Sequence, residues 1–204
     1  MQLIGMLDSP YVRRVAISMK RMGIPFDHNP LSVFRNYDQF RQISPTVKVP
    51  TLVCDDGVIL LDSTLIIDYL ESLVPVEKRL MPSDLAARRI ALRNVGLALV
   101  ACEKSVQRFY ELRLRPPEKQ HAPWLDRVNQ QMTSAFEALE AITSHAKPWI
   151  HGDVLMQDDI SAAVAWRFLQ FVMPDALDHA KFPALIAFCE RAEALPEFVA
   201  TPLD

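Results

Sequence analysis

The chain has 204 residues, of which 50% are hydrophobic and 23% charged, and its 22 basic and 25 acidic side chains give a net charge of −3. The apolar content excludes a disordered chain, and no apolar run reaches the roughly 20 residues of a membrane-spanning helix, so we expect no membrane segment. The mildly acidic balance argues against general nucleic-acid binding, although local pairs such as Arg13-Arg14 remain available for one anion.

Three cysteines, Cys54, Cys102 and Cys189, lie far apart, and none belongs to a C-x-x-C pair or to a zinc-ligand spacing. We therefore expect neither a disulfide framework nor a metal site. Residues 1–6 lead directly into a strand-like pattern, without the basic start and apolar stretch of a signal peptide. A cytoplasmic location is the resulting expectation.

Residues 1–74 mix the strand and helix periods of an α/β domain. The hairpin signal Asp55-Asp56-Gly57 separates two β-type runs. The predicted elements, in chain order, are a strand at 2–6, a helix from Pro10 that Gly23 closes, a strand at 25–29, a loop with one irregular helix at 31–43, strands at 51–54 and 58–61, and a helix from Thr64 whose inward face comprises Leu65, Ile66, Tyr69, Leu70 and Leu73.

Residues 75–85 contain two prolines and mixed charge, which is typical of a connection between domains. Beyond them only helical periods occur. A long helix ends at Pro116-Pro117, and the next helix extends to Pro148. A third helix extends to Pro174, with Phe168 and Phe171 on its inner face, and a fourth covers residues 182–189. The sequence therefore predicts an α/β domain at 1–74, a linker at 75–85 and an all-α domain at 86–204.

Ser9-Pro10 lies between the first strand and the first helix. A serine N-cap followed by proline at the first helical position is a common helix start whatever the function. Alternatively, the hydroxyl and the N–H groups of the helix start form a pocket for an anion, to which the helix dipole adds roughly half a positive charge. A thiolate suits that pocket, and Ser9 would donate a hydrogen bond to its sulfur.

Val49-Pro50 precedes the third predicted strand. Proline at a strand start is ordinary, and only about 5–6% of X–Pro bonds in folded proteins are cis. A cis bond would turn the Val49 N–H and C=O outward and offer a strand-like edge to an extended peptide near Ser9.

Asp62-Ser63 lies between the fourth strand and the third helix. Ser63 is a suitable N-cap, and an acidic residue beside a helix start is electrostatically favourable. In the functional interpretation, the Ser63 hydroxyl and the helix N–H groups bind a carboxylate while Asp62 accepts from an ammonium group. Together these groups would recognise the head group of an amino acid.

The chain resembles the cytosolic glutathione S-transferase family in the order and spacing of S-P-Y-V-R-R-V, S-P-T-V-K-V-P-T-L and L-L-D-S-T-L-I-I-D-Y-L, followed by an all-helical half. The resemblance covers nearly the whole chain. It implies a thioredoxin-like first domain, an all-α second domain, a homodimer, and glutathione as co-substrate. It also implies that Ser9 is the catalytic serine, that Val49 pairs with the backbone of the glutathione cysteine, that Pro50 is cis, and that Asp62 with Ser63 binds the γ-glutamyl group.

The sequence departs from the family pattern in both domains. Ser44 and Val47 stand where the family often has Asn and Gly in the loop before the third strand. In the second domain, Asp159 matches an Asp that opens a core helix, but Met156 occupies the position of the Ser or Thr N-cap. The capping box is therefore incomplete.

Our leading hypothesis is an enzyme in which the glutathione thiolate attacks a small electrophile. Conjugation, isomerisation, dehalogenation and peroxide reduction would share the same first-domain residues, so the reaction stays open. No motif identifies the basic residue for the glycine carboxylate of glutathione, and Arg35 and Lys48 are the candidates. The aromatic residues expected to contact the second substrate, a type that more often belongs to a core, are Tyr11, Phe34, Tyr110 and Trp166.

Two other interpretations compete with this hypothesis. One is a transferase-like fold kept as a binding or regulatory module, as in the stringent starvation proteins that bind RNA polymerase. Retention of Ser9, Val49-Pro50 and Asp62-Ser63 together argues instead for a working glutathione site. The other is a cysteine-dependent glutathione reductase or dehydroascorbate-type enzyme, which would need a cysteine where Ser9 stands.

Overall fold

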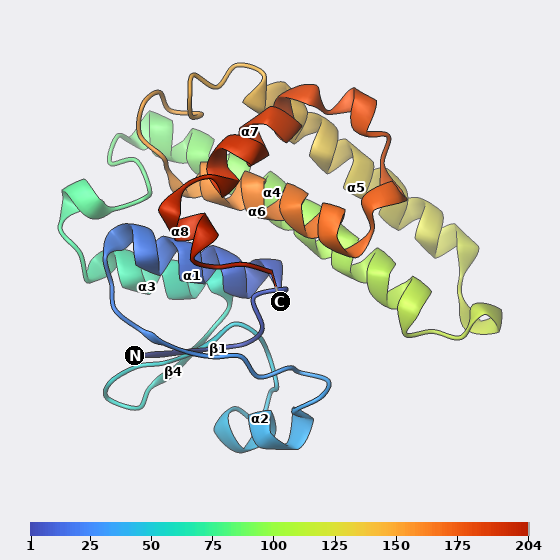
Figure 1. Cartoon of the computed structure of the whole chain (residues 1–204), viewed down its shortest axis with the longest axis horizontal. Coiled ribbons are helices and arrows are strands. Elements are labelled where there is room, and N and C mark those ends of the chain that lie inside the picture. Colours follow the sequence, from blue (N-terminus) through green and yellow to red (C-terminus); the bar gives the residue numbers. More distant parts are fainter. Residues whose placement is uncertain (204) are drawn as a thin grey trace. The chain divides into compact units, whose positions relative to one another are not determined.

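The computed structural model describes residues 1–203 as two compact units (Figure 1). The first unit comprises Met1–Leu80 together with the chain from Leu195 onward, and the second unit comprises Met81–Ala194. The division falls inside the predicted linker at 75–85. The last residues of the chain, however, belong to the first unit and not to the helical domain predicted at 86–204.

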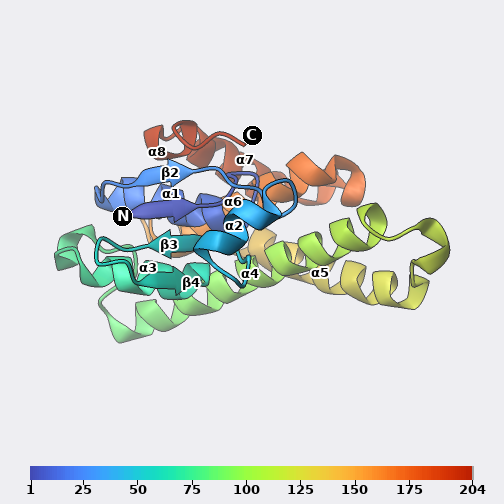
Figure 2. The ribbon, with the colours of Figure 1, turned by 90° about the horizontal axis from the view of Figure 1, so that it is seen from below.

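The first unit contains a four-stranded mixed sheet in the order β2-β1-β3-β4 (Figure 2). β1 runs parallel to β2 and antiparallel to β3, and β3 runs antiparallel to β4. The elements of this unit are β1 (Gln2–Ile4), α1 (Pro10–Met22), β2 (Asp27–Asn29), α2 (Tyr37–Ile43), β3 (Thr51–Val53), β4 (Ile59–Leu61), α3 (Ser63–Ser72) and the 3-10 helix η1 (Val76–Lys78). The predicted order β-α-β-α-β-β-α and the thioredoxin-like fold are confirmed.

Helices cover both faces of this sheet. α1 and α3 lie together on one face, and α2 lies on the other (Figure 1). On the α2 side, Ile4, Leu31 and Phe40 form one buried cluster. The sheet is therefore a central layer, and the loops that connect its strands to the helices lie at the ends of the strands.

Helix α1 begins and ends where the sequence predicts. Pro10 occupies its first turn, and Gly23 has a φ of 73°, the left-handed conformation that glycine adopts without a Cβ clash. The apolar residues of its inner face follow a helical period and are each at most 1% exposed: Val12, Val15, Ala16 and Met19.

Helix α3 buries a narrower face than the sequence predicts. Ile66 and Leu70 are fully buried, but Leu65, Tyr69 and Leu73 are 66%, 37% and 49% exposed. Positions 65, 69 and 73 are spaced by four residues and so share one face of the helix, which we call the α3 stripe. The prediction merged this stripe with the neighbouring face that packs against α1.

The C-terminal segment, which includes α8 (Pro196–Val199), is held on α1 by Arg13. The Nε of Arg13 donates to the Thr201 carbonyl oxygen at 2.8 Å, and its guanidinium carbon lies 5.7 Å from the centre of the Phe198 ring. Arg21 adds an ion pair with Glu197 at 3.3 Å. No sequence motif indicates which element this segment packs on, and the helical domain predicted at 86–204 is therefore corrected to end at Ala194.

The second unit is helical, as predicted, and α4 packs against α5 and α6. Its elements are α4 (Leu85–Arg113), η2 (Pro117–Lys119), α5 (Ala122–Thr143), α6 (Gln157–Val172), η3 (Pro174–Ala176), η4 (His179–Lys181) and α7 (Pro183–Glu193). Phe168 is buried as predicted, whereas Phe171 in the last turn of α6 is 46% exposed. Within residues 1–203, no helix combines the length and the apolar character that crossing a membrane requires.

Asp159 organises the start of α6 from the third helical position. Its Oδ2 accepts from the Met156 N–H at 2.7 Å, and its Oδ1 accepts from the Ile150 N–H at 2.9 Å. Burial raises the pKa of Asp159 to about 7, and the two backbone N–H donors oppose that rise. The folded protein therefore holds the Asp159 proton more tightly than the unfolded chain, in which the pKa is about 3.8.

We predict that the stabilising contribution of Asp159 is full below a pH of about 4 and is lost as the pH rises to about 7, with a slope of at most about 1.4 kcal/mol per pH unit. The difference in urea midpoint between wild type and Asp159→Asn should therefore shrink between about pH 4.5 and about pH 7.5. A difference that does not change with pH would contradict this prediction.

Candidate functional site

Strand pairing brings three loops to one edge of the sheet. Ile4 pairs with Thr51, and Thr51 pairs with Leu61. Because neighbouring antiparallel strands run in opposite directions, the end of β1, the start of β3 and the end of β4 lie at the same edge. The segments at this edge, which we call the site edge, are Gly5–Ser9, Val49-Pro50 and Asp62-Ser63.

Ser9 is the N-cap of α1, as both interpretations of its sequence require. Its Oγ accepts from the Val12 N–H at 3.5 Å, which is long for a hydrogen bond. This bond uses a lone pair of Oγ and leaves the hydroxyl proton for another acceptor. The half-buried Ser9 side chain can therefore cap the helix and donate to a bound anion at the same time.

The close approach of Val49 to α1 depends on Gly5, which the sequence analysis did not single out. Gly5 follows β1 and has a φ of 135°, a conformation that other residues rarely adopt. A Cβ at this position would lie 2.5 Å from Val12 Cγ2 and 2.9 Å from Val49 Cγ1. Glycine at the end of the first strand is the signal that could have found it, because such a glycine often marks a close approach of backbone.

The Val49-Pro50 peptide bond is cis. Thr51 Oγ1 donates to the Lys48 carbonyl oxygen at 2.6 Å, across the two residues of this bond. In the part of the chain that the structure describes, no hydrogen bond uses the Val49 N–H or C=O. These two groups can pair with the backbone of an extended ligand.

The loop before Val49 keeps an unusual backbone without the glycine that the family often has there. Val47 has a φ of 47°, which is uncommon for a β-branched residue. Its N–H donates to the Ser44 carbonyl oxygen at 3.0 Å, and the hydroxyls of Ser44 and Thr46 lie 3.0 Å apart. Local hydrogen bonds therefore support the turn at the two positions where the sequence departs from the family pattern.

The N-cap of α3 is Asp62 and not Ser63. Asp62 Oδ1 accepts from the N–H groups of Thr64 and Leu65 at 2.8 Å and 3.4 Å. The backbone of Asp62 has a φ of 68°, which Asp tolerates better than most residues. Ser63 occupies the first helical position, so its interpretation as a cap is corrected. The cap uses Oδ1, and Asp62 Oδ2 can accept from an ammonium group.

Ser63 is tied to α1 by Arg14. The Ser63 side chain is 3% exposed, and its Oγ accepts from Arg14 Nη1 at 2.9 Å. The same nitrogen donates to Thr64 Oγ1 at 3.2 Å. Arg13 and Arg14, considered from sequence as a pair for one anion, thus contact different elements of the first unit.

The site edge offers the groups that a thiol-containing peptide requires. Ser9 and the start of α1 can donate to a thiolate, Val49 can pair with a backbone, Ser63 can donate to a carboxylate, and Asp62 can accept from an ammonium group. Among residues 1–203, no three His, Cys, Asp or Glu side chains gather as a set of metal ligands.

The residues expected to contact a second substrate differ in exposure. Tyr11 is half-buried and Phe34 is 57% exposed in the first unit, and Tyr110 on α4 is 39% exposed. Trp166 is fully buried in the second unit, with its ring centre 5.5 Å from that of Phe136. An indole in this position packs in a core, so we leave Trp166 out of the proposed second-substrate surface.

The two candidates for the glycine carboxylate lie in exposed loops of the first unit. The Nη2 of Arg35 lies 3.7 Å from the Met6 sulfur, and Lys48 lies immediately before Val49. Their exposure leaves both side chains able to reach an anion, and the choice between them stays a prediction.

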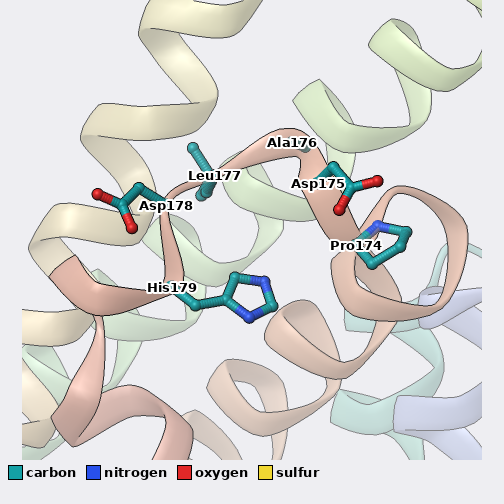
Figure 3. Close-up of a pocket in the computed structure, with 6 residues that line it drawn as sticks. All are labelled: Pro174, Asp175, Ala176, Leu177, Asp178 and His179. Carbon is teal, nitrogen blue, oxygen red and sulfur yellow. The ribbon is translucent and has the colours of Figure 1, made fainter.

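The hollow drawn in Figure 3 lies in the second unit, in the segment between α6 and α7. Pro174 to His179 line it, and none of the residues predicted from sequence is among them. Asp175 and Asp178 point away from each other, so the hollow offers no convergent pair of carboxylates (Figure 3).

A second pocket at the end of α4 contains Arg108 and Phe109. The Nε of Arg108 donates to Asn129 Oδ1 at 2.7 Å, and its Nη1 lies 2.8 Å from the Met173 sulfur. Burial lowers the pKa of the Arg108 guanidinium. Because the pocket lies at the C-terminal ends of α4 and α6, the carbonyl ends of both helices already complement this positive charge.

Comparison with known proteins gives a match in each unit. Residues 3–78 match the family model described as the glutathione S-transferase N-terminal domain. Residues 122–191 match the model described as the glutathione S-transferase C-terminal domain. Together the two matches cover most of the chain.

Individual solved structures and curated proteins are also similar to this chain. A glutathione transferase family member of Pseudomonas fluorescens Pf-5, solved with bound glutathione, is 31% identical, with 100% of this chain and 98% of that chain covered and a TM-score of 0.84. A glutathione S-transferase of Methylobacterium radiotolerans, in complex with glutathione sulfonate, is 28% identical, with 98% and 93% covered and a TM-score of 0.90. Maleylacetoacetate isomerase of Rattus norvegicus is 29% identical over 156 residues, which are 74% of this chain and 69% of that protein.

We predict that Gly5→Ala destabilises the first unit by about 2–4 kcal/mol, because it combines an unfavourable φ with a clash against Val12 and Val49. Gly57→Ala is the matched control, since Gly57 also has a positive φ, of 86°, but nothing lies within 4 Å of its added Cβ. It should cost about 1–2 kcal/mol. Equal losses in the free energy of unfolding for Gly5→Ala and Gly57→Ala, measured with urea, would show that the contact between Val49 and the start of α1 is loose.

Proposed function

This chain belongs to the glutathione S-transferase family, and on that premise we propose that it binds glutathione at the site edge and activates its thiol for attack on a small electrophile. The observation that carries the proposal is the strand register that gathers the loops of Ser9, Val49 and Ser63 at one edge. Glutathione bound to the solved relative of Pseudomonas fluorescens supports it.

Each part of glutathione has a complementary group in the proposed site. The thiol lies at Ser9, the cysteine backbone pairs with Val49, and the γ-glutamyl carboxylate lies at Ser63. Asp62 Oδ2 accepts from the γ-glutamyl ammonium. The glycine carboxylate lies near Arg35 or Lys48.

The chemical step begins with ionisation of the thiol. A free thiol has a pKa of about 8.5, and a hydrogen bond from Ser9 together with the start of α1 lowers that pKa because both favour the thiolate. The proton leaves to water, since the serine hydroxyl is a donor and not a base. The thiolate sulfur then forms a bond to the electrophilic atom of the second substrate. In a displacement the electron pair of the broken bond departs with the leaving group, and in an addition to a conjugated double bond it moves to the activating group, and the adduct takes a proton from water.

The reaction that follows is chosen by the electrophile. Conjugation, isomerisation, dehalogenation and peroxide reduction are the candidates, and relatives named maleylacetoacetate isomerase and probable maleylacetoacetate isomerase support isomerisation among them. Tyr11 and Phe34 of the first unit are the proposed contacts of the second substrate. The proposal is tested by measuring retention of the protein on immobilised glutathione and then its turnover of a panel of electrophiles, one for each candidate reaction. Retention without any turnover would favour the binding-module interpretation.

We also propose that the protein forms a homodimer. The α3 stripe exposes three large apolar side chains, and α4 carries the basic residues Arg88, Arg89 and Arg93 that can meet an acidic partner surface. Sedimentation equilibrium at micromolar concentration should give twice the 23.2 kDa of the chain. The change Leu65→Glu on the stripe should return the mass to that of one chain.

We predict that Ser9→Ala lowers kcat by about one to two orders of magnitude near neutral pH, because a hydrogen bond to a charged group contributes roughly 1.5–3 kcal/mol. The pKa of bound glutathione, followed by thiolate ultraviolet absorbance, should rise in this variant. Asp84→Ala is the control, since Asp84 caps α4 through the Ala87 N–H at 2.8 Å. It should lower stability alone, and the same result for Ser9→Ala would reduce Ser9 to a helix cap.

We predict that Ser63→Ala raises KM for glutathione and leaves kcat near its starting value, because the head group is bound equally in the ground and transition states. Ser72→Ala on the same helix is the control, since its Oγ donates to the Tyr69 carbonyl oxygen. A lower kcat with unchanged KM in Ser63→Ala would refute the assignment.

A further inference from the structure

The Ser63 hydroxyl is committed as an acceptor on its inner side. Arginine carries only donors, so the bond from Arg14 Nη1 must use a lone pair of Ser63 Oγ. The hydroxyl proton then points elsewhere. Within residues 1–203, the structure gives this proton no acceptor, although Ser63 is only 3% exposed.

The backbone beside this hydroxyl is also open to a ligand. Asp62 caps the N–H groups of Thr64 and Leu65 and accepts from Ile66 through its carbonyl oxygen. Among the described residues, no hydrogen bond uses the Ser63 N–H. Ser63 therefore presents two donors together, its N–H and its O–H, at the positive end of a helix of ten residues.

We propose that Arg14 is a positioning residue for glutathione, acting through Ser63. By donating to Ser63 Oγ, Arg14 directs the hydroxyl proton toward the α-carboxylate of the γ-glutamyl group. The role rests on the proposed glutathione site. It predicts that Arg14 strengthens binding of the γ-glutamyl α-carboxylate and of no other part of the ligand.

The neighbouring Arg13 provides a matched control. Both side chains lie on α1, and both are 2% exposed. Arg13 donates to the Thr201 carbonyl oxygen and holds the C-terminal segment, whereas Arg14 donates to Ser63. Replacing either arginine removes a buried cation from the same helix, so general effects on folding are shared and effects on the ligand are not.

Three ligands separate the groups of the γ-glutamyl residue. Glutathione has the α-carboxylate and the ammonium, glutaryl-cysteinylglycine has the carboxylate alone, and γ-aminobutyryl-cysteinylglycine has the ammonium alone. We would measure the Kd of each by isothermal titration for wild type, Arg14→Met, Arg14→Lys and Arg13→Met. The ratio of two Kd values on one sample is independent of the fraction of protein that is folded.

Arg14→Met should weaken glutathione and glutaryl-cysteinylglycine by about 10- to 100-fold and leave γ-aminobutyryl-cysteinylglycine unchanged. Arg14→Lys keeps the charge and should restore part of the loss, and it decides the question if Arg14→Met does not fold. Arg13→Met should lower the thermal midpoint and keep the wild-type ratios. In a Ser63→Ala background, Arg14→Met should have a smaller effect on glutathione than in wild type.

Equal losses for all three ligands would assign Arg14 a merely structural role and overturn the proposal. So would full additivity with Ser63→Ala, because Arg14 would then not act through Ser63. A wild-type protein that binds none of the three ligands would overturn the proposed function together with this role. Wild-type binding of glutathione, with ratios unmoved by Arg14→Met and Arg14→Lys, would remove the role of Arg14 alone.

Discussion

The backbone pairing of β3 with both β1 and β4 is the constraint on which the site depends. Thr51 meets Ile4 on one side and Leu61 on the other, and this register places the loops of Ser9, Val49 and Ser63 at one edge. A shift of one residue would turn buried Leu52 to the opposite face, so packing protects the register. The site is therefore assembled by the sheet, although its polar groups belong to loops and helix starts.

Electrostatics at this edge favour anions from two directions. The starts of α1 and α3 both point toward it, and Arg14 donates a hydrogen bond to Ser63 Oγ at the start of α3. Asp62 is the exception, because it caps α3 with one oxygen and keeps the other for a cation. This distribution suits a peptide with a thiolate, a carboxylate and an ammonium group in fixed order along its length.

Residues that define local backbone structure could be predicted from sequence, and residues that act through distant partners could not. Pro10 and Gly23 delimit α1 by their own backbone preferences, and the site motifs lie where their order suggested. The contact of Arg14 with Ser63 could not be predicted because the two residues lie 49 positions apart, and the C-terminal segment was misplaced because its anchor, Arg13, lies 188 residues from Thr201. Trp166 and the α3 stripe show that helical period alone does not tell a core face from an exposed one.

The most direct test of the account is the proton balance of glutathione binding. Wild-type protein would be titrated with glutathione near neutral pH in two buffers of different ionisation enthalpy, with S-methylglutathione as the control that has no thiol proton. A thiolate held by Ser9 and the start of α1 predicts release of close to one proton with glutathione and none with the methylated ligand. Binding of both ligands with the same enthalpy difference between buffers would mean that the thiol keeps its proton at the site edge, which contradicts the account.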